Sequence, residues 1–80
     1  MENKLAERIK KVMSAVFEIP VEQIQNKSSP DTIASWDSLK HMNMVIALEE
    51  EFNISFSDND TVSLIIYKLI LNITRSYLKL

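Results

Sequence analysis

Apolar residues recur every three or four positions in three stretches of the chain, and each stretch predicts an amphipathic helix. The first predicted helix covers residues 3–18. Pro20 ends it or opens the next turn, because a proline disfavours helical geometry in the residue before it. A short helical turn is expected at residues 21–24. The apolar stripe of the first helix consists of Leu5, Ile9, Val12, Val16 and Phe17.

The second predicted helix follows Asp37 and ends near Phe52. Asp37 is expected to cap its start, because a carboxylate can accept a hydrogen bond from a free N–H group of the first turn. Asn53 is expected to adopt the left-handed conformation that often ends a helix. The glutamates at 49–51 lie at the negative end of the helix dipole, so we interpret them as solvated or functional and not as stabilising. The apolar positions are Leu39, Met42, Val45, Ile46, Leu48 and Phe52.

The third predicted helix runs from about Thr61 to Tyr77, and its apolar stripe consists of Val62, Ile65, Ile66, Leu69, Ile70, Ile73 and Tyr77. A polar loop at 26–36 and a turn at 57–60 separate the helices, and Ile33 is expected to anchor the loop to the core. The chain contains no glycine and no credible pair of strands. We therefore predict an all-α fold, a small bundle of three main helices plus one or two short helical turns.

The length of 80 residues suits a single small domain. No cysteine is present, so neither a disulfide nor a thiolate metal site can add stability, and the core must come from the 46% of residues that are apolar. No segment approaches the roughly 20 apolar residues that span a membrane. The N-terminal segment MENKLAERIKK lacks the apolar run of a signal peptide. We expect a cytoplasmic monomer without membrane insertion.

The charge of the chain is unevenly distributed, although the net charge is only −2. Residues 31–60 contain seven acidic side chains and one basic one, Lys40. Nucleic-acid binding needs clustered lysine and arginine, so this acidic middle argues against a nucleic-acid partner. It suits a basic partner instead.

Ser38 and His41 lie three residues apart and are expected to share a helix face, which raises the possibility of a hydrolase. A serine nucleophile also needs an oxyanion hole and a third group that orients the base. Asp37 is already assigned to the helix cap, and no glycine-rich turn or sheet is available. We therefore expect no catalytic residues and no metal ligands, and we interpret His41 as a surface residue.

The segment DSLKHMNMVIALEEEF, residues 37–52, resembles the corresponding segment of acyl carrier proteins. The order of an amphipathic helix, a long loop, Asp-Ser-Leu at a helix start and a final apolar helix is also similar to that family. The resemblance implies a single acyl carrier domain over residues 1–80 that is not itself an enzyme. It implies that Ser38 carries a 4′-phosphopantetheine arm, which a phosphopantetheinyl transferase takes from coenzyme A with Mg²⁺ bound in the transferase. An acyl chain would be held on the arm as a thioester.

The resemblance also implies roles for other residues. The partners would be acyl-transferring and chain-elongating enzymes with basic docking patches, from fatty acid, polyketide or related lipid biosynthesis. Trp36 is either a core residue or a partner contact, and we expect it to be half-buried with its ring packed and its N–H in water. The implied partner-recognition residues are Trp36, Asp37, Leu39, Met42, Ile46, Glu49 and Glu50. The implied lining of an interior acyl cavity is Val45, Leu48 and Ile54.

Three departures from the family pattern are visible. Ser35 stands where the family often has glycine, and Lys40 and Asn43 stand at positions that are commonly acidic in fatty-acid carriers. The segment between Phe56 and the last predicted helix looks shorter than usual, which puts the short third helix of the family in doubt. These departures favour a specialised carrier. An aminoacyl or peptidyl carrier of non-ribosomal synthesis and an unmodified helical adaptor remain the alternatives.

Overall fold

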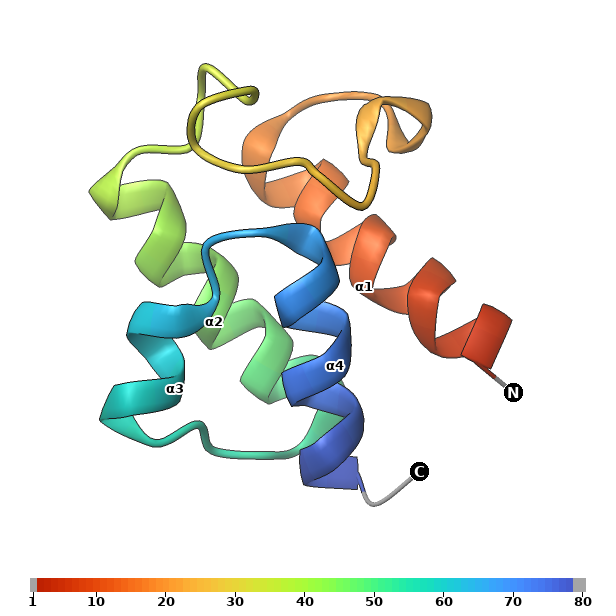
Figure 1. Cartoon of the computed structure of the whole chain (residues 1–80), viewed down its shortest axis with the longest axis vertical. Helices are drawn as coiled ribbons and strands as arrows, with labels where there is room; N and C mark the ends of the chain where they lie inside the picture. The colour runs from red at the N-terminus through yellow and green to blue at the C-terminus, as the bar shows by residue number, and fades with distance from the viewer. Residues whose placement is uncertain (1, 79–80) are drawn as a thin grey trace.

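The computed structural model describes residues 2–78 and consists of helices throughout (Figure 1). Its elements are α1 (Glu2–Phe17), the 3₁₀ turn η1 (Val21–Gln23), α2 (Ser38–Phe52), α3 (Asp58–Ser63) and α4 (Tyr67–Leu78). No strand forms within residues 2–78, which confirms the predicted all-α class. In the same part of the chain, no helix is both long and apolar enough to cross a membrane.

The helices α1 and α2 end in the same way, without glycine. Glu18 and Asn53 follow the two helices with φ values of 58° and 54°, in the left-handed region. The next backbone N–H reaches five residues back, from Ile19 to Ser14 O at 3.3 Å and from Ile54 to Glu49 O at 3.0 Å. These bonds satisfy carbonyl groups that the helix ends leave free. The left-handed Asn53 confirms its prediction, whereas nothing in the sequence singled out Glu18.

The long connection between α1 and α2 crosses one end of the bundle, as Figure 1 shows in orange to yellow. It is anchored to the core by Ile24, Ile33 and Trp36, which are all buried. The burial of Ile33 confirms the predicted anchor. Ser28 is also buried, and its hydroxyl accepts a hydrogen bond from Gln25 N–H at 2.8 Å. The connection therefore has fixed contacts beneath an irregular backbone.

The predicted helix from Thr61 to Tyr77 is wrong, because two helices cover this region. Ser57 caps α3 by accepting a hydrogen bond from Asp60 N–H, and α3 ends before the fully buried Leu64. The first N–H groups of α4 bind carbonyls of the long connection, Tyr67 N–H to Ser28 O at 2.9 Å and Lys68 N–H to Asn26 O at 3.2 Å. These bonds satisfy the N–H groups that a new helix start exposes. The short third helix that the sequence left in doubt is therefore formed.

One continuous core joins the helices. Packing of α1 on α2 and α4 brings most of the predicted first stripe inside, with Met13 added to it. Three residues of the third predicted stripe, Val62, Ile65 and Leu69, are exposed instead. The largest side chains that are almost completely buried are Phe17, Ile9, Met13, Ile24, Met44, Leu48, Leu64, Tyr67 and Ile70.

The glutamates at 49–51 are more structural than the sequence suggested. Glu49 is half-buried, and its Oε2 accepts the backbone N–H of Phe56 at 2.9 Å. Glu51 Oε2 lies 2.8 Å from Arg8 Nε in α1, and the Arg8 guanidinium also stacks over the Phe52 ring. The Arg8–Glu51 pair joins α1 to α2 across 43 residues of the chain, whereas the Glu49–Phe56 bond ties the end of α2 to the segment that follows it. The exposure of Glu50 and Glu51 agrees with their interpretation as solvated side chains, although Glu51 pairs with Arg8, whereas the half-buried Glu49 has a structural hydrogen bond that the sequence did not predict.

The Tyr67→Phe variant should be at least as stable as the wild type and should lose stability less in alkali. The Tyr67 hydroxyl is buried without a hydrogen-bond partner, and burial raises the pKa of Tyr67 above its ordinary value of 10.0. An unmet buried hydroxyl costs free energy. Because the unfolded chain ionises first, the wild type loses the contribution of neutral Tyr67 as the pH rises above 10.0. Urea titrations of both proteins from neutral to alkaline pH measure this, and a steeper alkaline loss in Tyr67→Phe would contradict it.

Candidate functional site

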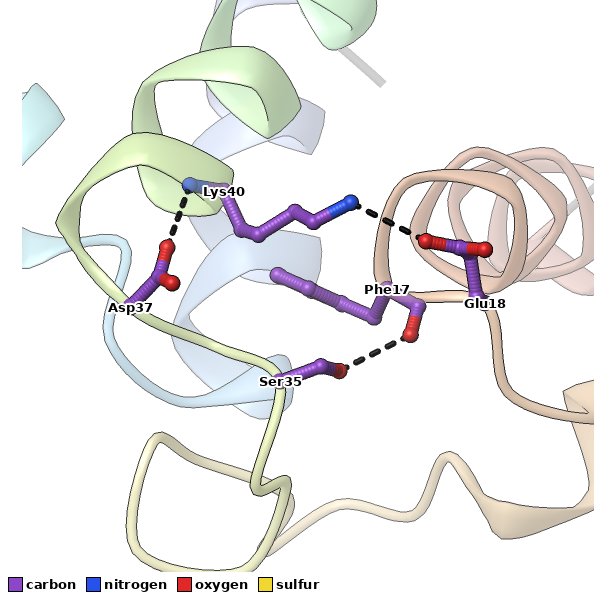
Figure 2. Close-up of polar contacts among 5 residues, drawn as sticks. All are labelled: Phe17, Glu18, Ser35, Asp37 and Lys40. Atoms are coloured by element: carbon purple, nitrogen blue, oxygen red, sulfur yellow. Dashed lines mark hydrogen bonds and ion pairs between the residues drawn. The ribbon is translucent and has the colours of Figure 1, made fainter.

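Ser38 is the first residue of α2, and its side chain is exposed at the end of the long connection. Asp37 precedes it in an extended conformation, with φ −104° and ψ −174°. Its Oδ1 accepts the Lys40 backbone N–H at 2.8 Å, as Figure 2 shows. The predicted cap is thus confirmed. Because Asp37 is extended and the helix starts only after it, Ser38 lies in the first turn of α2 and is exposed to solvent.

The Asp37→Ala variant should lower the free energy of unfolding by about 1 kcal/mol, because the Lys40 N–H loses its acceptor. Asp37→Asn keeps a side-chain oxygen and should retain most of the stability. Urea unfolding of the three proteins compares them directly. Equal losses in both variants would show that the charge of Asp37, and not its cap bond, matters for folding.

Two contacts fix the start of α2 against the end of α1 (Figure 2). The Ser35 hydroxyl donates to Phe17 O at 2.8 Å. Lys40 Nζ lies 3.2 Å from Glu18 Oε2. Ser35 does not have a positive φ, so the glycine that often occupies this position in the family is not needed for the backbone here. Lys40, the interruption of the acidic face, has a local partner within the chain.

Trp36 lies in the core, with only 4% of its surface exposed. Its ring stacks on Phe17 at 4.7 Å between centroids, and its Nε1–H donates to His41 Nδ1 at 3.1 Å. The expectation of a half-buried ring with its N–H in water is therefore wrong. The Trp36 ring can be buried because His41, one turn into α2, accepts the hydrogen bond from Nε1–H that water would otherwise accept. Trp36 therefore packs beneath the surface next to Ser38, and it offers little of its own surface to a partner.

His41 connects three parts of the chain. Its Nδ1 accepts from Trp36, and its Nε2 lies 3.0 Å from Thr61 O in α3. Indole nitrogen can only donate, so the neutral ring carries its proton on Nε2 and donates it to Thr61 O. Neither nitrogen is left to act as a base for Ser38, and the half-buried ring is not the surface residue that the sequence suggested. The arrangement gives a hydrolase no support.

A hollow with mainly apolar walls lies beside Ser38. It is lined by Pro30, Trp36, Asp37, Ser38, His41, Met42, Val62 and Ile65. The long connection, the first turns of α2, and the α3–α4 junction therefore meet at the serine. Nothing in the sequence predicts Pro30, Val62 or Ile65 at this place. The break between α3 and α4 positions Val62 and Ile65, and the path of the long connection positions Pro30.

The residues predicted to recognise partners separate into two groups. Leu39, Met42 and Ile46 are exposed apolar side chains on α2, with 70%, 48% and 50% of their surface accessible. Glu50 and Asp37 are also exposed. Glu49 is half-buried and bound to Phe56 N–H, so it offers only part of its carboxylate to a partner. The exposed group has the character of a docking face, an apolar stripe beside acidic side chains.

The residues predicted to line an interior cavity belong to the packed core. Val45 and Leu48 are buried, with 3% and 0% of their surface exposed, and Ile54 packs partly buried against the same core. None of the three lines the hollow beside Ser38. Within the described residues, no group of three or more His, Asp or Glu side chains could hold a metal ion.

Comparison with known proteins finds relatives that are similar in sequence to this chain. The chain is 40% identical over 62 residues to an acyl carrier protein of Buchnera aphidicola subsp. Schizaphis graminum (strain Sg), covering 78% of each chain. The chain belongs to the acyl carrier protein family. An acyl carrier protein of Buchnera aphidicola subsp. Acyrthosiphon pisum (strain Tuc7) is 39% identical over 56 residues, covering 70% of each chain. No family model matches the chain.

Membership in the acyl carrier protein family agrees with the helical bundle and with the exposed serine at the start of α2. The resemblance recognised in residues 37–52 is thereby confirmed at the level of the family.

Proposed function

We propose that the protein carries an acyl chain as a thioester on a 4′-phosphopantetheine arm attached to Ser38. The observation that carries the proposal is the exposed Ser38 of an Asp-Ser-Leu segment, placed as the first residue of α2 in a member of the acyl carrier protein family. The protein is a carrier of one acyl carrier domain and not an enzyme, and it works in the cytoplasm.

The arm is transferred from coenzyme A. Ser38 Oγ forms a bond to the phosphorus next to the pantetheine, and the bond from this phosphorus to the bridging pyrophosphate oxygen breaks. Adenosine 3′,5′-bisphosphate leaves, and the serine proton passes to a base of the phosphopantetheinyl transferase. This chain contributes the hydroxyl and its placement, while the transferase supplies Mg²⁺ and the base.

The start of α2 suits a phosphodiester. The first N–H groups of a helix have no partner within it, and the carboxylate of Asp37 satisfies only that of Lys40. Negative charge at this end is favoured by about 0.3–1 kcal/mol through the helix dipole. The remaining N–H groups are natural donors to phosphate oxygens. The negative charge of Asp37 opposes this gain. We therefore assign Asp37 to the helix cap and to recognition by the transferase, and not to binding of the phosphate.

The partner enzymes dock on the exposed face of α2. Leu39, Met42 and Ile46 supply its apolar contacts, and Asp37 and Glu50 supply charges for arginine and lysine on acyl-transferring and chain-elongating enzymes. Exposed charge pairs contribute about 0.2–1 kcal/mol each and weaken with salt. Binding should therefore be weak and salt-sensitive, which lets one carrier serve successive enzymes.

Loading with octanoyl-coenzyme A tests the carrier function. With Mg²⁺ and a broad-specificity phosphopantetheinyl transferase, the protein should gain one octanoyl-phosphopantetheine group. Neutral hydroxylamine should then remove the octanoyl group and leave the arm, because it cleaves thioesters. Intact-protein mass spectrometry measures both steps. A folded protein that gains no mass with several transferases would favour the unmodified helical adaptor.

A further inference from the structure

We propose that the acyl chain lies in an apolar trough on the outside of the bundle, across the α3–α4 junction, and not between the helices. This outer trough is defined by Pro30, Trp36, Met42, Val62, Ile65 and Leu69. The inference rests on the proposed function, because the arm on Ser38 is what brings the chain to the trough. It specifies the cargo as a plain, uncharged acyl chain.

Two adjoining hollows form the outer trough. The first contains Ser38 in its wall and reaches Val62 and Ile65. The second is lined by Ser29, Pro30, Asp31, Ile65, Ile66 and Leu69. Pro30 and Ile65 belong to both, so the apolar surface continues from the attachment point to the start of α4. An arm that begins at Ser38 can follow this surface without leaving the protein.

Three apolar residues in the walls of the outer trough are well exposed to water. Val62, Ile65 and Leu69 are large apolar residues with 69%, 51% and 41% of their surface accessible. Contiguous exposed apolar surface of this kind marks an interaction site. Covering it with an alkyl chain stabilises the contact by about 25 cal/mol for each Å² removed from water.

The interior offers less room beside Ser38. Met44, Leu48 and Leu64 have 0% of their surface exposed and fill the bundle. His41 joins α2 to α3 through Thr61 O and is held by Trp36 at 3.1 Å. A chain passing from Ser38 between α2 and α3 at this level would have to break these bonds, whereas the outer trough is already open.

The arm on Ser38 favours an attached acyl chain over any free molecule as the occupant of the outer trough. A chain on the arm is held near the outer trough at high effective concentration, so a weak apolar contact is enough to keep it there. Asp31 and Asp37 are the only charged side chains in the walls of the two hollows, and both are negative. Neither lysine nor arginine lines the two hollows, and both ring nitrogens of His41 are already bonded to Trp36 and Thr61. No basic group is therefore free to bind the carboxylate of an acidic cargo, and an uncharged alkyl chain fits the remaining walls.

NMR of the octanoyl-loaded protein tests the location. The octanoyl group is labelled with ¹³C, and intact mass spectrometry first establishes that the arm and the octanoyl group are present. Nuclear Overhauser effects from the chain should reach the methyl groups of Val62, Ile65 and Leu69. Effects to Val45, Leu48 and Ile54 instead would place the chain inside the bundle and overturn the proposal. Failure to load Ser38 would overturn the proposed function itself and would be visible in the mass spectrum before any NMR.

Matched variants separate the outer trough from the rest of the apolar surface. Ile65→Gln should abolish the effects to Leu69, whereas Val21→Gln should leave them unchanged. Ile65 and Val21 are both exposed apolar residues, with 51% and 37% of their surface accessible, but Val21 lies in η1 and lines neither hollow. Both variants should load fully, so their mass spectra serve as the control for the arm. Equal effects in the two variants, or none in either, would contradict the proposed location.

Discussion

Replacing Trp36 with alanine should lower the free energy of unfolding by about 3–5 kcal/mol. The side chain is 4% exposed, stacks on Phe17 and donates to His41, so its removal leaves a cavity and an unpaired ring nitrogen. At roughly 0.05–0.15 kcal/mol per residue, a domain of 80 residues has a free energy of unfolding of about 4–12 kcal/mol. The Trp36→Ala variant should therefore lose a large share of its stability and unfold at a much lower urea concentration than the wild type, as measured by circular dichroism and urea titration.

The Trp36→Phe variant separates packing from hydrogen bonding. It keeps an aromatic ring against Phe17 but leaves His41 Nδ1 without its donor. It should remain folded and lose about 1–3 kcal/mol, because the substitution leaves a buried acceptor unmet and a smaller ring in the core. A Trp36→Ala protein as stable as the wild type would show that Trp36 does not hold the long connection to the bundle.

Truncating Leu48 to alanine should cost about 2–5 kcal/mol, because the side chain is completely buried. Ile46→Ala, two residues earlier on the same helix and half exposed, is the matched control and should change stability by less than about 0.5 kcal/mol. Urea unfolding of both variants measures the difference. A cost below about 1 kcal/mol for Leu48→Ala would contradict close packing and would favour the interior acyl cavity predicted from the family.

The elements that could be predicted from the sequence depend on local chemistry. Asp37 caps α2 and Asn53 ends it because their own side chains suit these positions. The stripe of α1 was visible for a similar reason, since one face of a regular helix meets the core. The exposed Ser38 follows from the same cap. These features need no knowledge of distant residues.

The features that escaped prediction depend on contacts between distant segments. The break before α4 contains neither glycine nor proline, and the carbonyls of Asn26 and Ser28 stabilise the new helix start. The apolar spacing continues through the break and predicts a buried stripe that includes Val62 and Ile65, whereas the structure has both residues exposed beside Ser38. The pairing of Trp36 with His41 was hidden because their shared hydrogen bond exists only after the connection folds onto α2.

The attachment of the arm to Ser38 is tested most directly by mass spectrometry of three proteins. Wild type, Ser38→Ala and Ser35→Ala are incubated with coenzyme A, Mg²⁺ and a broad-specificity phosphopantetheinyl transferase, and their folding is checked by circular dichroism. Wild type and Ser35→Ala should each gain one phosphopantetheine, located on the peptide that contains Ser38, whereas Ser38→Ala should gain none. A modified Ser38→Ala protein, or a folded wild type that stays unmodified, would contradict the account.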